Sequence, residues 1–251
     1  MSACTFDLAM KRSAHVLASC RCARRRRVPV PPCLAAALAL CWLLLGSGAA
    51  AAAGVGRGMD QYVFSNDDQI VAADRFPPWS DMMARRAREA FSLEGCVSVA
   101  LSCTPSMRGA RTVVLRGRAL PLAEQLQLVN RFVNRRRYAE QSLGTRWETP
   151  ATFLKDGGDC EDYAVTKYFL LRAMGVPAED LRIVVGRTRH RSAYHALLAV
   201  RVATRVADRV LLLDTDDQLL PGERRSDYLY LYSINEVSLW DHAGHTLSAA
   251  R

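Results

Sequence analysis

The sequence predicts an α+β fold, in which helices from the first half of the chain pack on an antiparallel sheet formed by the second half. Apolar residues recur at helical spacing in three segments between residues 76 and 175, and strand-like apolar runs follow between residues 181 and 232. Helices and strands do not alternate along the chain, as they would in a parallel α/β fold. With 251 residues, half of them hydrophobic, the chain is long enough for one domain with a sizeable core.

The first 53 residues have the order of a secretory signal. Four arginines, 24–27, precede an apolar run at residues 34–45, and small residues follow up to Ala53. The apolar run is shorter than the roughly 20 residues that cross a bilayer. We therefore expect cleavage near residues 51–53 and export to the periplasm, with retention as an inner-membrane anchor as the alternative. This leader would be the only part of the chain that contacts a membrane.

Charge is unevenly distributed along the chain. The leader holds seven of the 34 basic residues but only one of the 25 acidic residues. Much of the formal net charge of +9 therefore belongs to the leader, and we do not expect nucleic acid as a partner.

The helices are expected in the first half of the domain. Residues 54–75 are polar and predict an irregular N-terminal segment, and the domain is expected to span residues 76–251. A proline pair followed by apolar residues at spacings of three and four predicts a helix over residues 76–92. A second amphipathic helix is expected from Pro121 to the arginines at 135–137. We interpret these arginines as a solvated helix end rather than a binding patch, because the helix dipole favours cations there.

The third helix has the clearest boundaries. Gly157 and Gly158 precede it, and Gly175, followed by Pro177, ends it in the manner of a glycine C-cap. Four strand-like runs follow, at residues 181–185, 195–202, 210–214 and 228–232.

Three cysteines lie outside the leader. Cys96 and Cys103 are seven residues apart near a turn, a spacing that suits a small-loop disulfide in an oxidising compartment; two buried thiols are the alternative. In either case Cys160 has no partner, and an unpaired cysteine in an exported protein is a candidate nucleophile.

Cys160 lies at the expected start of the third helix. Backbone N–H groups and the positive end of the helix dipole stabilise a thiolate there, and the preceding glycines let a substrate approach. The acids Asp159, Glu161 and Asp162 oppose this by raising the thiol pKa, so a histidinium or a bound cation is required. A small core cysteine is the alternative interpretation.

His195 and Asp214 are the expected partners of this cysteine. If the runs at 195–202 and 210–214 form a hairpin centred at residues 204–205, the two side chains lie nearly opposite each other, where a carboxylate can orient an imidazole. Packing of the third helix on this sheet would bring Cys160 to the other imidazole nitrogen and complete a nucleophile, base and orienting acid. A surface histidine and a turn-forming aspartate are the alternatives.

The sequence motifs around these residues resemble those of the bacterial transglutaminase-like cysteine proteinases, which include LapG-type periplasmic proteases. The resemblance covers about residues 76–242 and is most specific between residues 147 and 164. It is carried by Gly158–Ala164 (GDCEDYA), Trp147 and Pro150, Met174-Gly175-Val176, Tyr232–Asn235 and Trp240. The Cys96 and Cys103 pair and residues 130–134 fit some members as well.

The resemblance implies a papain-like, transglutaminase-like core with Cys160 as nucleophile, His195 as general base and then acid, and Asp214 as the orienting acid. The family tends to place asparagine after that aspartate, where this chain has Thr215, so Asp216 is an alternative orienting acid. For Trp147 we favour a buried core position, and a role in lining the substrate cleft or supporting the oxyanion site is the alternative.

LapG-type enzymes hold a calcium ion beside the nucleophile, so the resemblance implies Ca²⁺ ligands at Asp159, Glu161 and, less directly, Asp162. Carboxylate oxygens suit this hard cation, although helix starts are also rich in acids for dipole reasons alone. The implied substrate is a large cell-surface adhesin of biofilms, and the implied partner is an inner-membrane receptor for a cyclic dinucleotide.

The expected activity is therefore that of an exported cysteine endopeptidase. A transglutaminase or amidase would use the same triad with a different acceptor or substrate. A non-catalytic binding module built on this fold is the alternative from another functional class.

Overall fold

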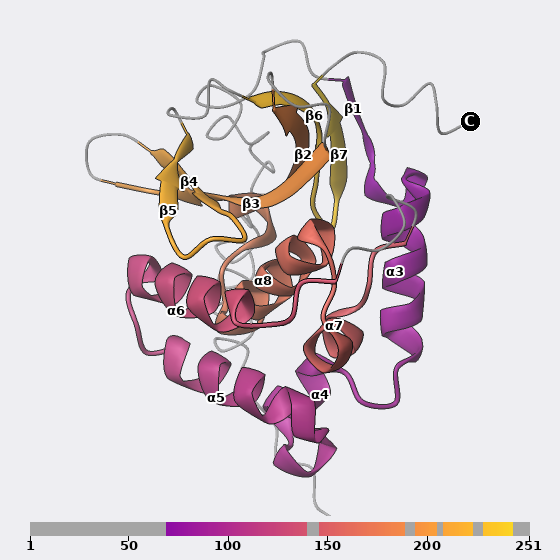
Figure 1. The fold of residues 1–251 in the computed structure, drawn as a ribbon, viewed down its shortest axis with the longest axis vertical. Helices are drawn as coiled ribbons and strands as arrows, with labels where there is room; N and C mark the ends of the chain where they lie inside the picture. Colours follow the sequence, from indigo (N-terminus) through magenta and orange to yellow (C-terminus); the bar gives the residue numbers. More distant parts are fainter. Residues whose placement is uncertain (1–68, 140–145, 189–193, 205–207, 223–227, 243–251) are drawn as a thin grey trace, which may run out of the picture. The chain divides into compact units, whose positions relative to one another are not determined.

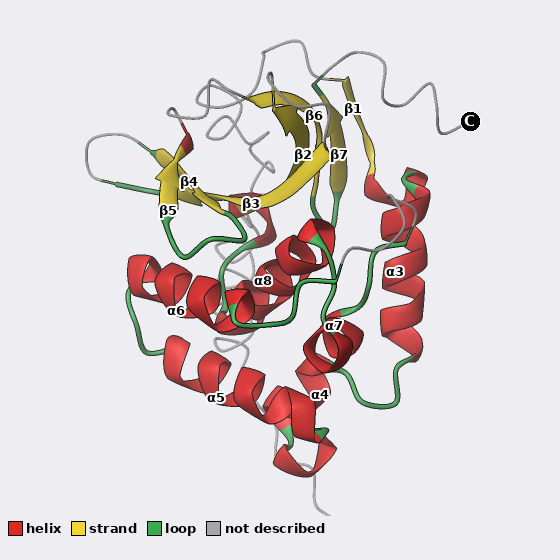
Figure 2. Ribbon diagram, viewed as in Figure 1, coloured by secondary structure: helices red, strands yellow, loops and turns green. Residues whose placement is uncertain are grey.

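The structure is a computed structural model that describes residues 69–139, 146–188, 194–204, 208–222 and 228–242. The leader and residues 54–68 lie outside these ranges, and everything described belongs to one compact unit. Helices come first along the chain and the strands of one sheet come afterwards, apart from one N-terminal strand (Figures 1 and 2). The predicted α+β class is confirmed. Within the described ranges, none of the helices is both long and apolar enough to cross a membrane.

Two of the expected helices have nearly the expected bounds. The first begins at its proline pair, with Pro77 in the first helical turn, and the second ends at Asn134, so that Arg136 and Arg137 lie beyond it. Three further helices were not expected from the sequence. The described helices are α3 (Pro77–Arg88), α4 (Leu93–Ser98), α5 (Arg108–Gly117), α6 (Leu122–Asn134), α7 (Pro150–Asp156) and α8 (Cys160–Met174).

Helix α8 is the centre of the core. Nearly all its residues are buried, because α5, α6 and α7 pack on it from one side and strands β2 (Leu181–Thr188) and β3 (Tyr194–Val202) from the other. It ends at Gly175, which has a positive φ of 105° and so adopts a left-handed conformation that favours glycine. A helix buried on every side fixes its first residue, Cys160, firmly against the sheet.

The sheet has seven strands in the order β1-β7-β6-β2-β3-β4-β5, with every neighbouring pair antiparallel. The end of the segment expected to be irregular is in fact ordered, because residues 69–72 form β1 on the edge of β7 and residues 73–75 a 3₁₀ turn. That pairing joins segments far apart in the sequence, which a local pattern does not show. The remaining strands are β4 (Arg209–Leu213), β5 (Leu219–Pro221), β6 (Tyr228–Ile234) and β7 (Ser238–Asp241).

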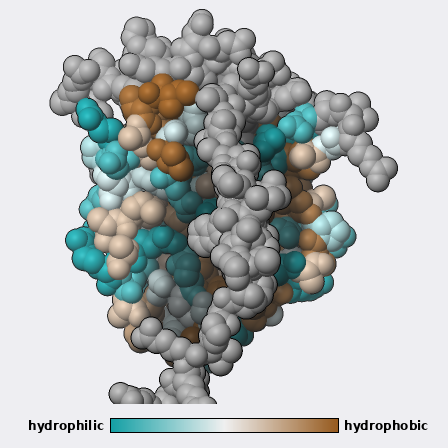
Figure 3. Space-filling view, turned by 180° about the vertical axis from the view of Figure 1, so that it is seen from behind, coloured by the Kyte–Doolittle hydropathy of each residue, from teal (hydrophilic) through white to brown (hydrophobic). Residues whose placement is uncertain are grey.

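The sheet is buried on both faces near its centre. Leu198, Val200 and Leu213 belong to the main core with α8, whereas Leu197 and Leu212 belong to a smaller cluster on the opposite face. Seen from behind, strongly hydrophobic residues gather in a small group near the top of the view, and much of the visible remainder is hydrophilic or mixed (Figure 3).

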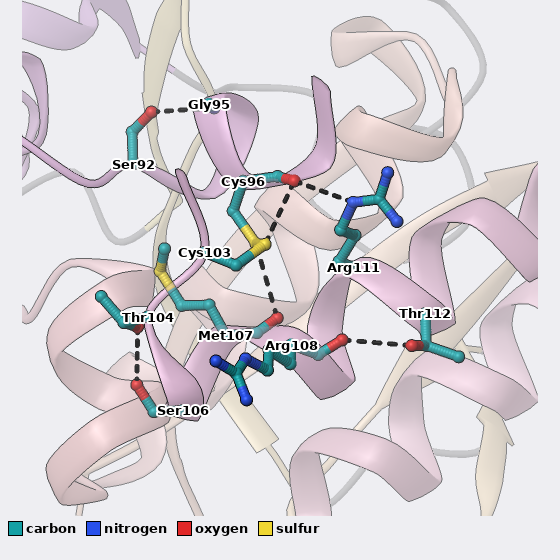
Figure 4. Close-up of a disulfide and its surroundings, with 10 residues drawn as sticks. All are labelled: Ser92, Gly95, Cys96, Cys103, Thr104, Ser106, Met107, Arg108, Arg111 and Thr112. Atoms are coloured by element: carbon teal, nitrogen blue, oxygen red, sulfur yellow. Dashed lines mark hydrogen bonds between the residues drawn. A yellow bond between two sulfur atoms is a disulfide. The ribbon is translucent and has the colours of Figure 1, made fainter. Parts of the chain in front are cut away.

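Cys96 and Cys103 form a disulfide, which confirms the expected pairing (Figure 4). It closes a short loop between α4 and the turn that precedes α5. The Nε of Arg111, on α5, donates a hydrogen bond of 3.1 Å to the carbonyl oxygen of Cys96. The disulfide loop is thereby joined to the helical layer, while Leu101 at its tip is 95% exposed.

Candidate active site

Cys160 is the first residue of α8 and is buried, and a pair of glycines brings the chain to it. Gly157 has a φ of +82°, and a Cβ there would lie 2.2 Å from the carbonyl oxygen of Arg137. Gly158 donates its N–H to that same oxygen (3.3 Å) and accepts from the N–H of Ala139 (2.9 Å). The approach to the cysteine is thus fixed against residues 137–139.

The start of α8 is closed by a capping box. The Oδ2 of Asp162 accepts the backbone N–H of Asp159 at 3.1 Å, while its Oδ1 accepts the backbone N–H of Glu148 at 2.6 Å. Burial raises the pKa of Asp162 to about 6, although these two N–H groups act in the opposite direction. Asp162, expected as a weaker calcium ligand, therefore has both oxygens engaged by the backbone.

The acids next to Cys160 oppose its ionisation, as the sequence indicates. Burial raises the pKa of the thiol, and the carboxylate of Glu161 raises it further, both by its charge and by accepting the thiol proton at 3.0 Å. A hydrogen bond from the backbone of Ala196 acts in the other direction. The sulfur therefore lies against β3, beside the residue that follows His195.

His195 and Asp214 meet directly. The Nε2 of His195 lies 2.5 Å from the Oδ1 of Asp214, which also accepts the backbone N–H of Thr215 at 2.7 Å. Asp216, the alternative orienting acid, instead accepts the backbone N–H of Gln218 with its Oδ1. The geometry thus selects Asp214 as the histidine's carboxylate partner.

The expected register of the hairpin was wrong by two residues. β3 and β4 pair Leu198 with Leu213, so the next position, Asp214, falls opposite Leu197 rather than opposite His195. Residues 195 and 197 point to the same face of the strand, and the diagonal neighbour is within reach of a histidine. His195 and Asp214 are therefore diagonal neighbours in the register of β3 and β4, rather than directly opposite residues.

Amide and ammonium groups bind the backbone of residues 214–216, which we call the Asp214 loop. This role was not predicted from the sequence. The Nζ of Lys167 donates to the carbonyl oxygen of Asp214 (2.5 Å), and so does the Nδ2 of Asn134 (3.2 Å). The Nδ2 of Asn130 donates to the carbonyl oxygen of Asp216 (2.8 Å). Lys167 follows Cys160 by seven residues, so both lie on one face of α8. A lysine within an otherwise apolar helix face was the available signal.

Asp159 and Glu161 form a close carboxylate pair. Burial raises the pKa of Asp159 to about 7, and the charges of Asp162 and Glu161, together with a hydrogen bond to Glu161, raise it further. Two oxygen-bearing side chains that repel each other suit a hard cation such as Ca²⁺. No group of three or more His, Cys, Asp or Glu side chains within the described ranges has metal-binding geometry.

Trp147 lies in the aromatic core. It is 2% exposed, and its ring packs edge-on against Phe76 (5.6 Å between centroids) and Trp79 (6.1 Å). This placement favours the core role over a lining of the cleft. A cavity of about 580 Å³ lies elsewhere, between α7 and the segments at 89–91 and 104–106, and none of the candidate catalytic residues lines it.

Comparison with known proteins agrees with this geometry. The family described as bacterial transglutaminase-like cysteine proteinase matches residues 90–244, more than half of the chain. No curated protein gives a significant match.

Solved structures of LapG from Legionella pneumophila are similar to this chain. The calcium-bound structure is 30% identical with a TM-score of 0.52 over 60% of this chain and 87% of LapG. The EGTA-treated structure is 29% identical with a TM-score of 0.53 over 62% and 88%. A further LapG structure is 27% identical with a TM-score of 0.52 over 64% and 98%.

Proposed function

This chain belongs to the bacterial transglutaminase-like cysteine proteinase family and is a cysteine peptidase, and on that premise we propose that Cys160, His195 and Asp214 form its catalytic triad. The observation that carries the proposal is the 2.5 Å contact between His195 Nε2 and Asp214 Oδ1, which joins β3, a strand packed on the helix that begins at Cys160, to the residue that follows β4. Its substrate is a protein, as for any peptidase.

In the proposed reaction, Asp214 orients the imidazole through Nε2, so that Nδ1 exchanges the proton with the thiol. His195 takes the proton of Cys160, and the thiolate attacks the carbonyl carbon of the peptide bond. Backbone N–H groups near residue 160 stabilise the oxyanion. His195 then protonates the leaving amine, and water hydrolyses the thioester to release the acid and restore the thiol.

Before this reaction begins, the thiol donates a hydrogen bond to the carboxylate of Glu161. Its raised pKa means that ionisation depends on a positive neighbour, and His195 supplies one when it becomes an imidazolium. The thiol must also exchange its hydrogen bond to Glu161 for one to the imidazole before the proton is transferred. Glu161 thus acts against the nucleophile unless its charge is offset.

Calcium is the proposed source of that offset. Asp159 and Glu161 fit as ligands because they are a close pair of carboxylates at the start of α8, whereas Asp162 is occupied by backbone N–H groups. When bound there, a divalent cation neutralises part of the carboxylate charge that raises the thiol pKa. Both a calcium-bound and an EGTA-treated form of the similar LapG have been solved, which supports testing this ion.

The finer biological role is also a proposal. The signal-like leader and the disulfide support export to the periplasm. The family resemblance supports a large surface adhesin as substrate and an inner-membrane receptor for a cyclic dinucleotide as partner.

The test is incubation of the purified protein with the N-terminal region of a candidate adhesin, in parallel with C160A, H195A and D214N. We expect a discrete cleavage that C160A abolishes and that EGTA reduces. A labelled amine added with a glutamine-containing donor distinguishes the rival chemistry. Amine incorporation without cleavage, or cleavage by C160A, would overturn the proposal.

A further inference from the structure

The positive charge of the domain is concentrated in one short segment. Residues 105–139 contain eight arginines and a single acidic residue, Glu124, whereas the chain outside this segment and the leader has 19 basic and 23 acidic residues. The segment forms α5 and α6, which lie side by side and are joined by a short connection at one end (Figure 1).

Five of these arginines lie at the end of the helix pair that is away from the connection between α5 and α6. A Cβ at Gly109, near the start of α5, would lie 3.1 Å from the ring of Phe132 on α6 and 3.8 Å from the guanidinium of Arg136, which itself stacks over that ring at 4.7 Å. The start of α5 therefore meets the end of α6. We call this set the arginine surface; its members are Arg108, Arg131, Arg135, Arg136 and Arg137.

The arginine surface has no carboxylate partner in the part of the chain that the structure describes. Arginines elsewhere, such as Arg85, Arg172 and Arg201, form ion pairs, but no described ion pair includes a member of the arginine surface. Arg137 donates to the carbonyl oxygen of Asp156 instead (2.9 Å). Arg108, Arg131, Arg135 and Arg137 are exposed.

This arrangement opposes helix stability. Arg108 lies in the first turn of α5, where the positive end of the helix dipole disfavours a cation, and that turn has no acid. Arg131, in the last turn of α6, and Arg135, just after its end, are four residues apart, a like-charge spacing that is unfavourable, although the helix dipole favours cations at that end. A solvated helix end explains the arginines after Asn134, but it does not explain Arg108. Arginines that have no described carboxylate partner and that also interact unfavourably with the helix dipole or with each other indicate a binding surface.

The arginine surface adjoins the nucleophile. The Oη of Tyr163, on the first turn of α8, donates to the carbonyl oxygen of Arg136 at 2.6 Å, and Gly158 donates to that of Arg137. Cys160 follows two residues after Gly158. A polypeptide bound at Cys160 can therefore extend over the arginine surface.

We propose that the arginine surface binds acidic side chains of the protein substrate, in a segment flanking the peptide bond that is cleaved. The inference rests on the proposed function, since it assigns a substrate class to the same site. Planar guanidinium groups bind carboxylates in a bidentate manner, and they carry their charge at every working pH. An anionic membrane is the other surface that arginines fit. The hydrogen bonds from Tyr163 and Gly158 to the carbonyl oxygens of Arg136 and Arg137 place the arginine surface beside Cys160, however, and this favours a polypeptide.

Binding is measured with C160A, so that cleavage does not interfere, by the fluorescence anisotropy of a labelled glutamate-rich peptide and a glutamine-rich peptide of equal length. We expect the acidic peptide alone to bind, with an affinity that falls as salt is added. R131Q/R135Q should weaken binding at least about fivefold. The control R88Q/R209Q removes the same charge from two exposed arginines on α3 and β4 and should leave binding nearly unchanged.

Thermal unfolding shows whether the variants fold, and R131Q/R135Q should have a Tm close to that of the parent, because the lost dipole interaction at the end of α6 offsets the removed like-charge repulsion. Equal binding by both double variants, or no binding of the acidic peptide by the folded parent, would overturn the inference. So would binding of phosphatidylglycerol vesicles through Arg131 and Arg135 without binding of the peptide. Cleavage by the wild type is scored separately, so a failed peptidase assay beside arginine-dependent binding counts against the proposed function and not against the surface.

Discussion

Replacing Lys167 by methionine should change how the stability of this protein depends on pH. Lys167 is 1% exposed, and its ammonium group donates to the carbonyl oxygen of Asp214, the proposed orienting acid. Methionine preserves the length of the side chain and its packing but has no charge. The substitution therefore isolates the free energy of keeping a titratable group inside the core.

The magnitude follows from the pKa of the lysine in the two states. Burial lowers the pKa of Lys167 from 10.5 to about 7 in the folded protein, against the opposing charges of Asp214, Asp216 and Asp217. Below pH 7 both states hold the proton, and the full cost of burying the charge is present. Between the two pKa values the folded state loses the proton while the unfolded state keeps it, so stability rises by about 1.4 kcal/mol per pH unit. The whole window corresponds to about 5 kcal/mol.

Urea unfolding of wild type and K167M, followed by tryptophan fluorescence between about pH 6.5 and pH 9.5, measures this dependence. We expect the stability advantage of K167M to be largest at the acidic end and to shrink by about 1.4 kcal/mol per pH unit above pH 7. K155M is the control, because the side chain of Lys155 is 72% exposed, and it should differ from wild type by less than about 0.5 kcal/mol throughout. A constant difference between wild type and K167M across the range would refute a lowered pKa.

Three further predictions concern the disulfide, the triad and the metal. C96S/C103S should lower the free energy of unfolding by about 2.5 kcal/mol, the loop-closure value for so small a loop, in urea titrations without reductant. D214N should reduce kcat about 10²- to 10⁴-fold in the folded protein; D216N should retain near-normal kcat, and an equal loss in both variants would contradict the assignment of Asp214. Calcium should raise the Tm of wild type, EGTA should reverse the rise, and D159N should respond less; identical shifts in D159N would argue against this ligand.

The parts of the fold that local residues determine were predictable. Gly157 before α8 and Gly175 at its end have a positive φ that favours glycine, and a Cβ at Gly158 would lie 2.2 Å from the Oδ2 of Asp162, so the helix bounds follow from the sequence. The pairing of His195 with Asp214 was also correct, although the register was not. A local apolar pattern does not determine the register of a hairpin, and the diagonal contact tolerated the difference because both side chains lie on one face.

Features that depend on distant partners were not predictable. Lys167 is visible in the sequence as one charge on an otherwise apolar helix face, but only its contact with the carbonyl oxygen of Asp214 shows what the buried ammonium group binds. Helix α5 has glycines at 109 and 117 and β-branched residues between them, so its local propensity is weak. Its packing on α6 and α8 determines its conformation instead.

The pairing of β1 with β7 has a consequence for the order in which the domain can assemble during synthesis. β1 is the first described strand to leave the ribosome, and its only neighbour, β7, is the last. The edge of the sheet therefore stays incomplete until nearly the whole domain has emerged, and β1 must wait in an extended, unpaired state. If the chain is translocated unfolded, this wait extends across the membrane, and a chaperone that covers short extended segments would protect β1 in the meantime.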